Sequence, residues 1–108
     1  MLCVGQPAAI RLALALAAGF TSAPADAQGD RALGEYLSSE CVTCHQLSGR
    51  YQGIPPIVGW PVHSFVEIME EYRSKKRNNP VMQTIAAKFS KDEIAALAAY
   101  FGSVKPRN

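Results

Sequence analysis

Two cysteines that are separated by two residues and followed at once by a histidine constrain this chain more than any other feature. They are Cys41 and Cys44, followed by His45, in the run Cys-Val-Thr-Cys-His, and the only other cysteine is Cys3 near the amino terminus. A pair with this spacing can form a disulfide, bind a metal or attach a cofactor. The rest of the sequence discriminates between these three uses.

The amino-terminal segment is predicted to be a removable export signal. Arg11 precedes an apolar run over residues 12–20 that is too short to cross a membrane as a stable helix, and residues 25–27 read Ala-Asp-Ala, which suits a signal peptidase. We therefore expect residues 1–27 to be removed and residues 28–108 to form one domain in the periplasm, with no membrane span after cleavage. The alternative, an uncleaved membrane anchor, would need roughly 18 or more apolar residues.

The mature domain is small and carries little net charge. A domain of this length buries too little apolar surface to be comfortably stable without a disulfide, a metal or a large cofactor. The formal net charge is +2 at pH 7, and signal removal takes away one cation and one anion, so the balance does not change. Such a balance does not suggest a nucleic-acid-binding protein.

Attachment of haem explains the spacing of the cysteine motif. Two thiols three positions apart at the end of a helical turn can each add to one vinyl group of the porphyrin, and the next residue then lies under the iron as an imidazole ligand. We therefore predict one covalent haem c attached through Cys41 and Cys44, with His45 as the proximal iron ligand. Haem would also supply the core that the small domain lacks.

Three other uses of the cysteine pair explain less of the sequence. A thioredoxin-like dithiol needs strands and helices around the pair, and the sequence holds no convincing strand. A zinc site needs four ligands, and only His63 is an obvious candidate outside the motif. A plain disulfide leaves His45 without a role and the apolar loop after it without a group to cover.

The sequence predicts an all-α domain of about four helices with loops that wrap the haem. Asp30 can cap a first helix that ends near Cys41. Residues 46–61 then contain six glycines and prolines, which exclude regular structure, yet they also carry large apolar side chains. We expect the apolar side chains of this loop to pack against another group.

Two later helices begin at capping-box patterns, Ser64 with Glu67 and Ser90 with Glu93. Between them, the Asn-Asn-Pro run at residues 78–80 ends one helix before a short helical stretch follows. Apolar residues at three- and four-residue spacing mark the buried faces. They are Phe65, Ile68, Met69 and Tyr72 in one helix, and Ile94, Leu97, Ala98 and Phe101 in the other.

The distal iron ligand is predicted to be Met82. It follows the break at residues 78–80, where an irregular segment can hold the thioether toward the iron. Met69 lies on an apolar helical face and is better explained by core packing, and His63 lies beside a helix start, where it stays in solvent. Methionine opposite histidine raises the reduction potential and fills the sixth position, which favours an electron carrier over oxygen chemistry.

Residues of the apolar loop are expected to surround the haem. The carbonyl of Pro55 or Pro56 can accept a hydrogen bond from the ring nitrogen of His45 that does not bind iron. Trp60 and Tyr51 can direct their polar tips at the haem carboxylates, or they simply fill space in a small core.

These features together resemble the class I c-type cytochromes. The attachment motif comes early in the mature chain, a loop of glycines and prolines follows, a methionine comes late, and the last helix ends in aromatic residues. The likeness covers nearly all of residues 30–104, and it implies the class I cytochrome c fold with residues 28–108 as its domain. It also implies that Gly34 and Tyr100 form the contact between the terminal helices.

A narrower likeness is to the cytochrome subunit of flavocytochrome c sulfide dehydrogenase. It is carried by four segments, residues 65–72, 77–82, 85–86 and 90–101. By this resemblance Cys41, Cys44, His45 and Met82 match the haem-attachment, proximal and distal positions. Two features depart from the family pattern: Gln46 replaces the usual glycine, and the chain has one attachment motif where some members have two.

The resemblance implies that the protein accepts single electrons from an FAD-containing flavoprotein that oxidises sulfide, and passes them to another cytochrome or an oxidase. By itself it is not predicted to be a catalyst. A freely diffusing carrier that serves a terminal oxidase is the alternative within the class. A haem enzyme or gas sensor with an open sixth iron position is the alternative from another class.

The docking surface is predicted to have an apolar centre that includes Ile57 and Val58. A subunit that is held permanently needs buried apolar area more than long-range attraction, and the small net charge agrees with this. The basic run at residues 73–77 is then at most a rim that steers an acidic partner, or a solvated helix end.

Overall fold

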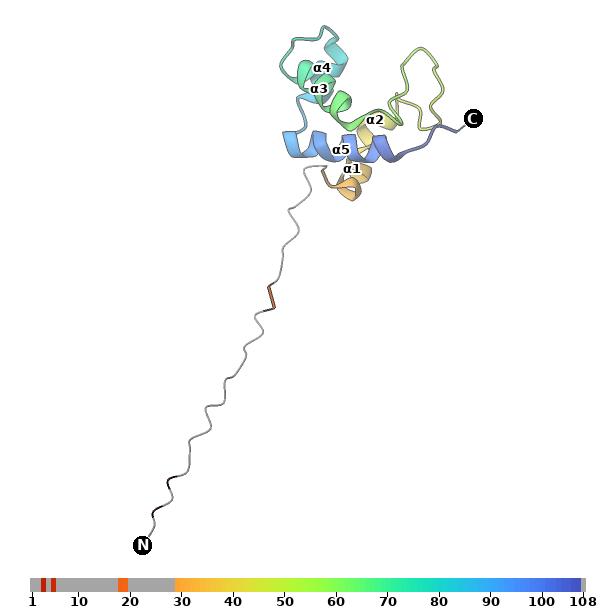
Figure 1. Cartoon of the computed structure of the whole chain (residues 1–108). Helices are drawn as coiled ribbons and strands as arrows, with labels where there is room; N and C mark the ends of the chain where they lie inside the picture. Colours follow the sequence, from red (N-terminus) through yellow and green to blue (C-terminus); the bar gives the residue numbers. More distant parts are fainter. Residues whose placement is uncertain (1–2, 4, 6–17, 20–28, 108) are drawn as a thin grey trace.

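The structure, a computed structural model, describes residues 29–107 together with Cys3, Gly5, Ala18 and Gly19. Within residues 29–107 the chain forms five helices and no strand (Figure 1), which confirms the all-α prediction. The helices are α1 (Arg31–Leu37), α2 (Ser39–Val42), α3 (Val62–Arg73), α4 (Pro80–Ala86) and α5 (Lys91–Ser103).

The predicted signal peptide, residues 1–27, lies outside the described residues apart from Cys3, Gly5, Ala18 and Gly19. Its removal and its cleavage site therefore stay predictions. Among the described residues, none of the helices combines the length and the apolar character that a membrane span requires.

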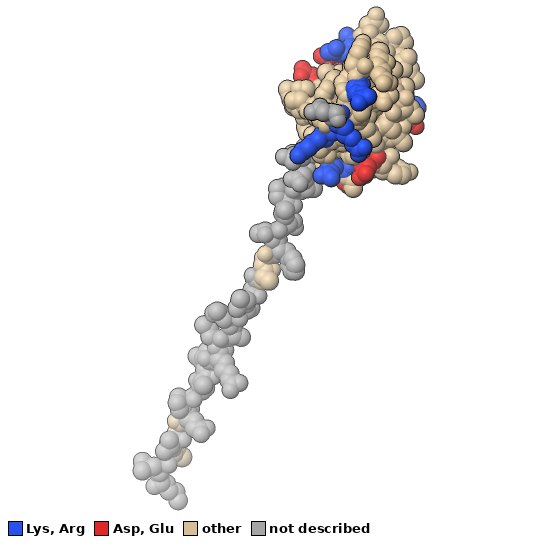
Figure 2. All heavy atoms as spheres, turned by 90° about the vertical axis from the view of Figure 1, so that its right-hand side faces the viewer, with Lys and Arg blue, Asp and Glu red and all other residues tan. Residues whose placement is uncertain are grey.

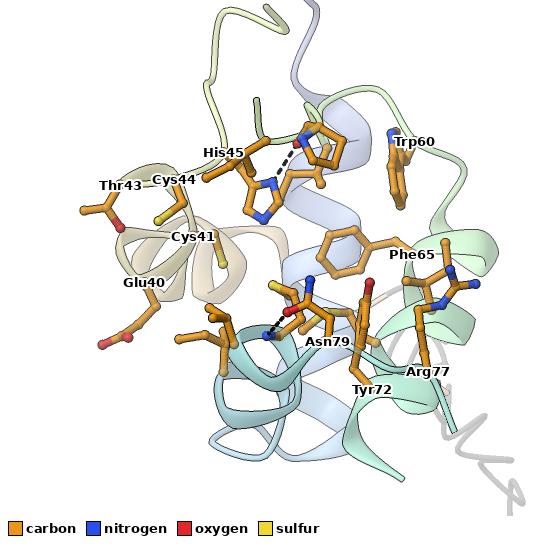
Figure 3. Close-up of a pocket in the computed structure, with 18 of the residues that line it drawn as sticks. Glu40, Cys41, Thr43, Cys44, His45, Trp60, Phe65, Tyr72, Arg77 and Asn79 are labelled. Carbon is orange, nitrogen blue, oxygen red and sulfur yellow. Dashed lines mark hydrogen bonds between the residues drawn. The ribbon is translucent and has the colours of Figure 1, made fainter. Parts of the chain in front are cut away.

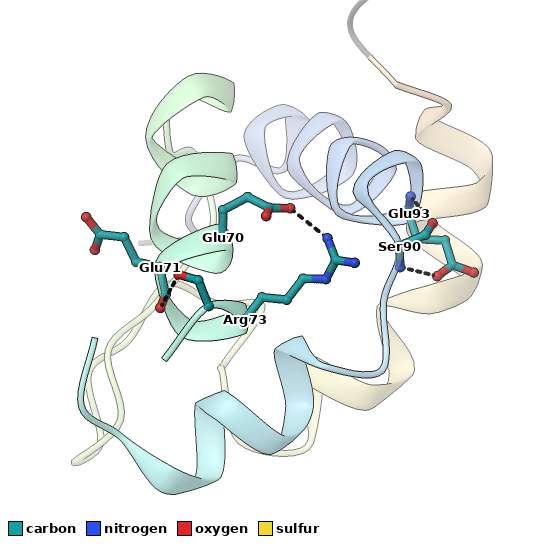
Figure 4. Close-up of polar contacts among 6 residues, drawn as sticks. Glu70, Glu71, Arg73, Ser90 and Glu93 are labelled. Atoms are coloured by element: carbon teal, nitrogen blue, oxygen red, sulfur yellow. Dashed lines mark hydrogen bonds and ion pairs between the residues drawn. The ribbon is translucent and has the colours of Figure 1, made fainter. Parts of the chain in front are cut away.

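α5 is the central helix of the fold, with α1 below it and α3 above it in the view of Figure 1. Its predicted apolar stripe is completely buried; the residues are Ile94, Leu97, Ala98 and Phe101. The predicted capping box begins the helix (Figure 4). The Ser90 hydroxyl accepts a hydrogen bond from the Glu93 amide at 3.2 Å, and the Glu93 carboxylate accepts one from the Ser90 amide at 2.8 Å.

The first predicted helix is two helices. α1 is capped as expected by Asp30, whose carboxylate accepts hydrogen bonds from two amides of the first turn at 2.9 and 3.1 Å. It ends before Ser38, which donates to the carbonyl of Glu35 through its amide and through its hydroxyl. This tighter turn closes α1. α2 then carries Cys41 into the buried interior.

α3 begins three residues earlier than the sequence predicted. Ser64 and Glu67 were expected to form a capping box at its start, but Pro61 occupies the N-cap position and no side chain caps the helix. The fixed φ of proline suits a helix start. The Glu67 carboxylate lies 3.7 Å from the imidazole of His63 instead. The capping-box prediction is therefore wrong at this helix.

The apolar face of α3 nevertheless follows the predicted pattern. Phe65 and Met69 are buried against α5, and the ring of Phe65 stacks on Phe101 with centroids 5.8 Å apart. Ile68 and Tyr72 are half-buried and line a cavity. One face of α3 thus serves both the core and the cavity.

Met82 lies in a helix and not in the irregular segment that was predicted. Pro80 occupies the first turn of α4, and the side chain of Asn79 accepts a hydrogen bond from the Met82 amide at 3.1 Å. Proline is well suited to the first helical position, where its missing amide is not needed. The Asn-Asn-Pro run therefore starts α4, whereas α3 ends earlier than predicted, at Arg73.

Residues 46–61 contain no helix or strand, as predicted, and the carboxyl-terminal end of the chain ties this loop down. The Gly59 amide donates to the carbonyl of Phe101 at 2.8 Å, and the Arg107 amide donates to the carbonyl of Ser48 at 2.9 Å. Figure 2 faces this region and shows Lys and Arg side chains gathered beside the carboxyl-terminal end. The apolar loop is thus held at two points.

The contact between the terminal helices depends on Gly34. A Cβ atom at this position would collide with the carbonyl group of Ala96 and would lie 2.9 Å from Cβ of Tyr100. The absence of a side chain therefore allows α1 and α5 to approach closely. This is the contact that the family resemblance implied for Gly34 and Tyr100.

We predict that Gly34→Ala lowers the free energy of unfolding by about 1–3 kcal/mol, because the added methyl group forces two packed helices apart. Chemical denaturation measures the loss. Gly102→Ala is the matched control on α5, since its Cβ would meet the Trp60 carbonyl oxygen at 3.0 Å, and a smaller loss is expected. Equal losses of unfolding free energy in the two variants would contradict the conclusion that Gly34 allows α1 and α5 to approach closely.

Candidate functional site

A large apolar cavity lies between α2, the turn that follows it, the loop at residues 53–60, α3 and α4. Its volume is about 790 Å³, within the range of about 300–1,000 Å³ that is usual for sites that bind small molecules and cofactors. Figure 3 shows the side chains that line it. The structure brings six predicted site residues to its wall: Cys41, Cys44, His45, Pro55, Trp60 and Met82.

The two cysteines lie on one side of the cavity (Figure 3). The turn after α2 places them there, because the amides of Cys44 and His45 both donate to the carbonyl of Cys41, at 3.1 and 2.8 Å. Both thiols are free; Cys41 is buried and Cys44 is exposed. Burial, with a smaller effect of the Glu40 charge, raises the pKa of the Cys41 thiol to about 11. The Cys41 sulfur is therefore protonated at neutral pH.

The imidazole of His45 is oriented by the loop. Its Nδ1 lies 2.6 Å from the carbonyl oxygen of Pro55. Because a carbonyl oxygen can only accept, Nδ1 must carry the hydrogen, and the neutral ring then has its lone pair on Nε2. The predicted hydrogen bond is thus present, with Pro55 as the acceptor and Pro56 outside the cavity wall.

Met69 and Met82 both line the cavity, so a place in its wall does not decide which of them is the better candidate for the distal iron ligand. Met82 is half-buried at the start of α4, whereas Met69 is buried in the core cluster. The side chain of His63 is 84% exposed and is not part of the cavity wall, in agreement with the prediction that it stays in solvent.

Two expectations about the loop are corrected by its packing. Tyr51 is 69% exposed and does not line the cavity, so it does not share the position of Trp60. Ile57 and Val58 are buried in the core, because residues 46–61 fold back onto α5. They therefore do not offer an exposed apolar docking centre.

The sequence interpretation did not single out Asn79 or the exposed Val81, which both line the cavity. Arg77 also lines it, so one member of the basic run at residues 73–77 lies at the rim where the sequence interpretation placed the run. Two of its arginines form ion pairs with acids of α3: Arg73 with Glu70 at 3.4 Å and Arg77 with Glu71 at 2.8 Å. The Asn-Pro pair that begins α4 is the sequence signal for a turn at this point.

The zinc alternative has no supporting geometry in the part of the chain that the structure describes. No three His, Cys, Asp or Glu side chains converge there in a way that could hold a metal ion. A structural zinc site needs four such ligands.

The chain is similar to known cytochromes along most of its length. It is 34% identical over 82 residues to cytochrome c-554(548) of Halomonas halodenitrificans, and the match covers 69% of this chain and 96% of that protein. The chain belongs to the class I c-type cytochromes. The cytochrome is also 28% identical over 76 residues to the cytochrome subunit of sulfide dehydrogenase of Chlorobaculum tepidum, with 69% of each chain covered.

A third relative of the cytochrome is longer. The thiosulfate dehydrogenase electron acceptor of Thiomonas intermedia is 31% identical over 72 residues, which are 64% of this chain and 33% of that protein. The cytochrome thus spans about a third of the length of this relative. No family model matches the chain.

Haem is the cofactor of c-type cytochromes, and the residues of this cavity fit it. The wall is mainly apolar, as a porphyrin ring requires, and two free thiols lie on one side of it. The hydrogen bond to Pro55 leaves Nε2 of His45 with a free lone pair, which a metal ligand needs. The donor set of the cavity, imidazole nitrogen and thioether sulfur, is the pair that holds iron in cytochromes c.

Proposed function

We propose that this cytochrome carries one haem c bound covalently through Cys41 and Cys44 and transfers single electrons. The observation that carries the proposal is the presence of two free thiols and the imidazole of His45 in the wall of one apolar cavity. The spacing of these residues is the attachment signature of c-type haem. Haem would also fill the interior of a domain that is too short to be comfortably stable without a bound group.

The bound haem supplies reversible one-electron exchange at its iron, and the chain sets the environment of that exchange. His45 is the proposed proximal ligand, through Nε2. Its hydrogen bond to the carbonyl of Pro55 fixes the tautomer and the ring plane and makes the free nitrogen more basic. The apolar wall excludes water from the ring.

Met82 is the proposed distal ligand. Its amide is fixed by Asn79 at the start of α4, while its side chain is half-buried in the cavity wall. Met69 packs in the core with Phe65 and Phe101, and its removal from this cluster would leave a void. A methionine at the sixth position also discourages binding of small gases, which favours an electron carrier over a gas sensor or a haem oxidase.

The proposed electron donor is a periplasmic dehydrogenase that oxidises a reduced sulfur compound, with a flavoprotein sulfide dehydrogenase as the first candidate. Two relatives support this choice through their names, the cytochrome subunit of sulfide dehydrogenase and the thiosulfate dehydrogenase electron acceptor. Removal of residues 1–27 would place the cytochrome in the same compartment. Onward transfer goes to another cytochrome or to an oxidase.

The proposed docking surface is the mouth of the cavity. Val81 is 68% exposed and Ile54 is 39% exposed, and both line the cavity. They come from α4 and from the loop, so they mark two parts of its rim. Exposed apolar residues next to a redox site suit a partner surface with an apolar centre.

The first test is the mass of the exported protein after denaturation. We expect the mass of a chain that begins at Gln28 plus one haem, because two thioether bonds survive denaturation. Replacement of Cys41 and Cys44 by serine should give a protein from which acidified organic solvent extracts any haem. A wild-type chain without haem, or with haem that is extracted, would refute covalent attachment.

The second test separates the two methionines. Met82→Ala should abolish the weak far-red absorption band of methionine-ligated ferric haem and allow carbon monoxide to bind the reduced protein. Met69→Ala should keep the band but lose about 2–5 kcal/mol of unfolding free energy, because it removes a buried side chain. The reverse pattern would exchange the two roles, and carbon monoxide binding by the wild-type protein would favour a gas sensor.

The third test concerns the docking surface. Val81→Glu should weaken binding to the purified flavoprotein subunit by about tenfold, since a charge would be buried at an apolar contact. Val62→Glu is the matched control, because Val62 is 38% exposed and lies outside the cavity wall. Titration calorimetry at low and high salt measures both. Unchanged binding by the Val81 variant, or binding that is lost in salt, would favour a steered, diffusing carrier.

A further inference from the structure

One part of the surface of residues 29–107 carries cations without matching acids. No Asp or Glu occurs in residues 41–66 or in residues 94–108, and these two segments contain Arg50, Lys105 and Arg107. Every other Lys and Arg among the described residues pairs with an acid or lies within five residues of one in the sequence. The uncompensated positive charge is therefore concentrated in the two acid-free segments.

Two contacts bring these segments together in the fold. The Arg107 amide donates to the carbonyl of Ser48 at 2.9 Å. Beside this tie, a Cβ atom at Gly49 would lie 2.8 Å from Cβ of Pro106, so the backbone of the loop lies directly against the proline ring. Arg50 follows this contact in the loop, and the other two cations flank the proline. Cations that are far apart in the sequence thus come from adjacent stretches of backbone.

We call Arg50, Lys105 and Arg107 the basic surface. All three residues are exposed, and none of them forms an ion pair with a described residue. Figure 2 faces this region and shows blue side chains gathered beside the carboxyl-terminal end, with the nearest red atoms at the lower edge of the group. The cations are therefore free to meet an anionic group from outside the chain.

Apolar side chains accompany these cations. Tyr51, next to Arg50 in the loop, is 69% exposed, and Leu47 is 39% exposed. Tyrosine and arginine are enriched where proteins contact one another, because they combine a large apolar body with a polar or charged tip. The composition of this area is therefore typical of a protein contact and unlike a surface that only meets solvent.

The basic surface is separate from the mouth of the cavity. None of its three cations lines the cavity wall, whereas Val81 and Ile54, which mark the mouth, both do. The basic surface lies instead where the loop meets residues 104–107. A partner bound there does not occupy the apolar contact that is proposed for the dehydrogenase.

We propose that the basic surface binds an acidic segment of a second protein and leaves the mouth of the cavity to the dehydrogenase. An acidic segment complements these cations without displacing an acid of the cytochrome. An electron carrier needs one partner that gives the electron and another that takes it, so the onward acceptor is the partner assigned to this surface. That assignment rests on the proposed function.

A protein suits this surface better than a lipid membrane does. Basic clusters that bind anionic lipids carry about four to eight Lys or Arg side chains, whereas the basic surface has three. The exposed ring of Tyr51 adds the kind of contact that a protein partner uses. An anionic membrane is therefore the competing occupant that the experiment must separate from an acidic protein segment.

Lys75 and Lys76 provide a matched control on another part of the surface. They are exposed and lie outside the cavity wall, but they follow Glu70 and Glu71 closely in the sequence. Substitution of these two lysines changes the net charge by as much as substitution of two members of the basic surface. Different effects of the two double substitutions would therefore reflect position and not net charge.

The test uses the reduced, haem-loaded protein with hexaglutamate as the probe and hexaglutamine as its neutral counterpart. Nuclear magnetic resonance spectra of the ¹⁵N-labelled protein show which amides shift when the peptide is added at low salt. We expect hexaglutamate to shift the amides of residues 48–51 and 104–107, and not those of residues 75–76. Hexaglutamine should shift none of them, because it offers no charge to the cations.

The double variant Arg50→Gln with Arg107→Gln should bind hexaglutamate about tenfold more weakly, because it removes two of the three cations. Lys75→Gln with Lys76→Gln should weaken binding by less than about twofold. The Arg107 substitution keeps the backbone amide that ties the loop. Lys105→Gln, with a smaller expected loss, and the shift map of the wild-type protein keep the proposal testable if the double variant fails to fold.

Shifts centred on residues 75–76, or equal losses in the two double variants, would overturn the inference, because net charge alone would then explain the binding. Vesicles of phosphatidylglycerol test the membrane. Vesicle binding that depends on Arg50 and Arg107, without localised binding of hexaglutamate, would overturn the inference in favour of a lipid surface. A mass without covalent haem would instead refute the proposed function, so the two failures are distinguishable.

Discussion

The close approach of α1 to α5 at Gly34 determines where everything else in this small domain lies. Because α1 rests directly on α5, the chain enters α2 beside the core and delivers Cys41 to a buried position. α3 packs on another side of α5 through the stacked rings of Phe65 and Phe101. The cavity is the space that remains between these elements and α4. Its shape thus follows from helix packing around α5.

The features that the sequence predicted correctly are local. The capping box at Ser90 and the apolar stripe of α5 depend on neighbours within one or two turns, so their patterns survive folding. The same holds for the cap at Asp30 and for the turn that carries His45. The turn at His45 and the last helix are also among the features on which the class I resemblance depends.

The features that the sequence did not predict correctly depend on contacts between segments far apart in the chain, or on two helix-start signals that compete. Ser64 and Glu67 offered a capping box, but Pro61 starts α3 first. Ile57 and Val58 carry no periodic pattern, and only the return of the loop to α5 shows that they are buried. The roles of the charged residues were hardest to predict, because they depend on which acid each side chain pairs with and on whether it is exposed to solvent.

The charges around the cavity illustrate this last point. The basic run at residues 73–77 suggested one surface, yet Arg73 and Arg77 each pair with a different acid of α3 and face different surroundings. Their local neutralisation agrees with a docking surface whose centre is apolar. The formal charges in the sequence therefore did not predict which arginine lines the cavity. The position of each side chain in the structure shows it.

The ties between residues 101–107 and the loop make the orientation of His45 depend on a segment that is far from it in the sequence. Ser48 and Gly59, on either side of Pro55, are held by Arg107 and Phe101. The imidazole of His45 is oriented through that loop. A chain that lacks residues 104–107 would thus lose the tie at Ser48, one of the two points that hold the loop. The ring of His45 would then be oriented by a loop with greater freedom to move.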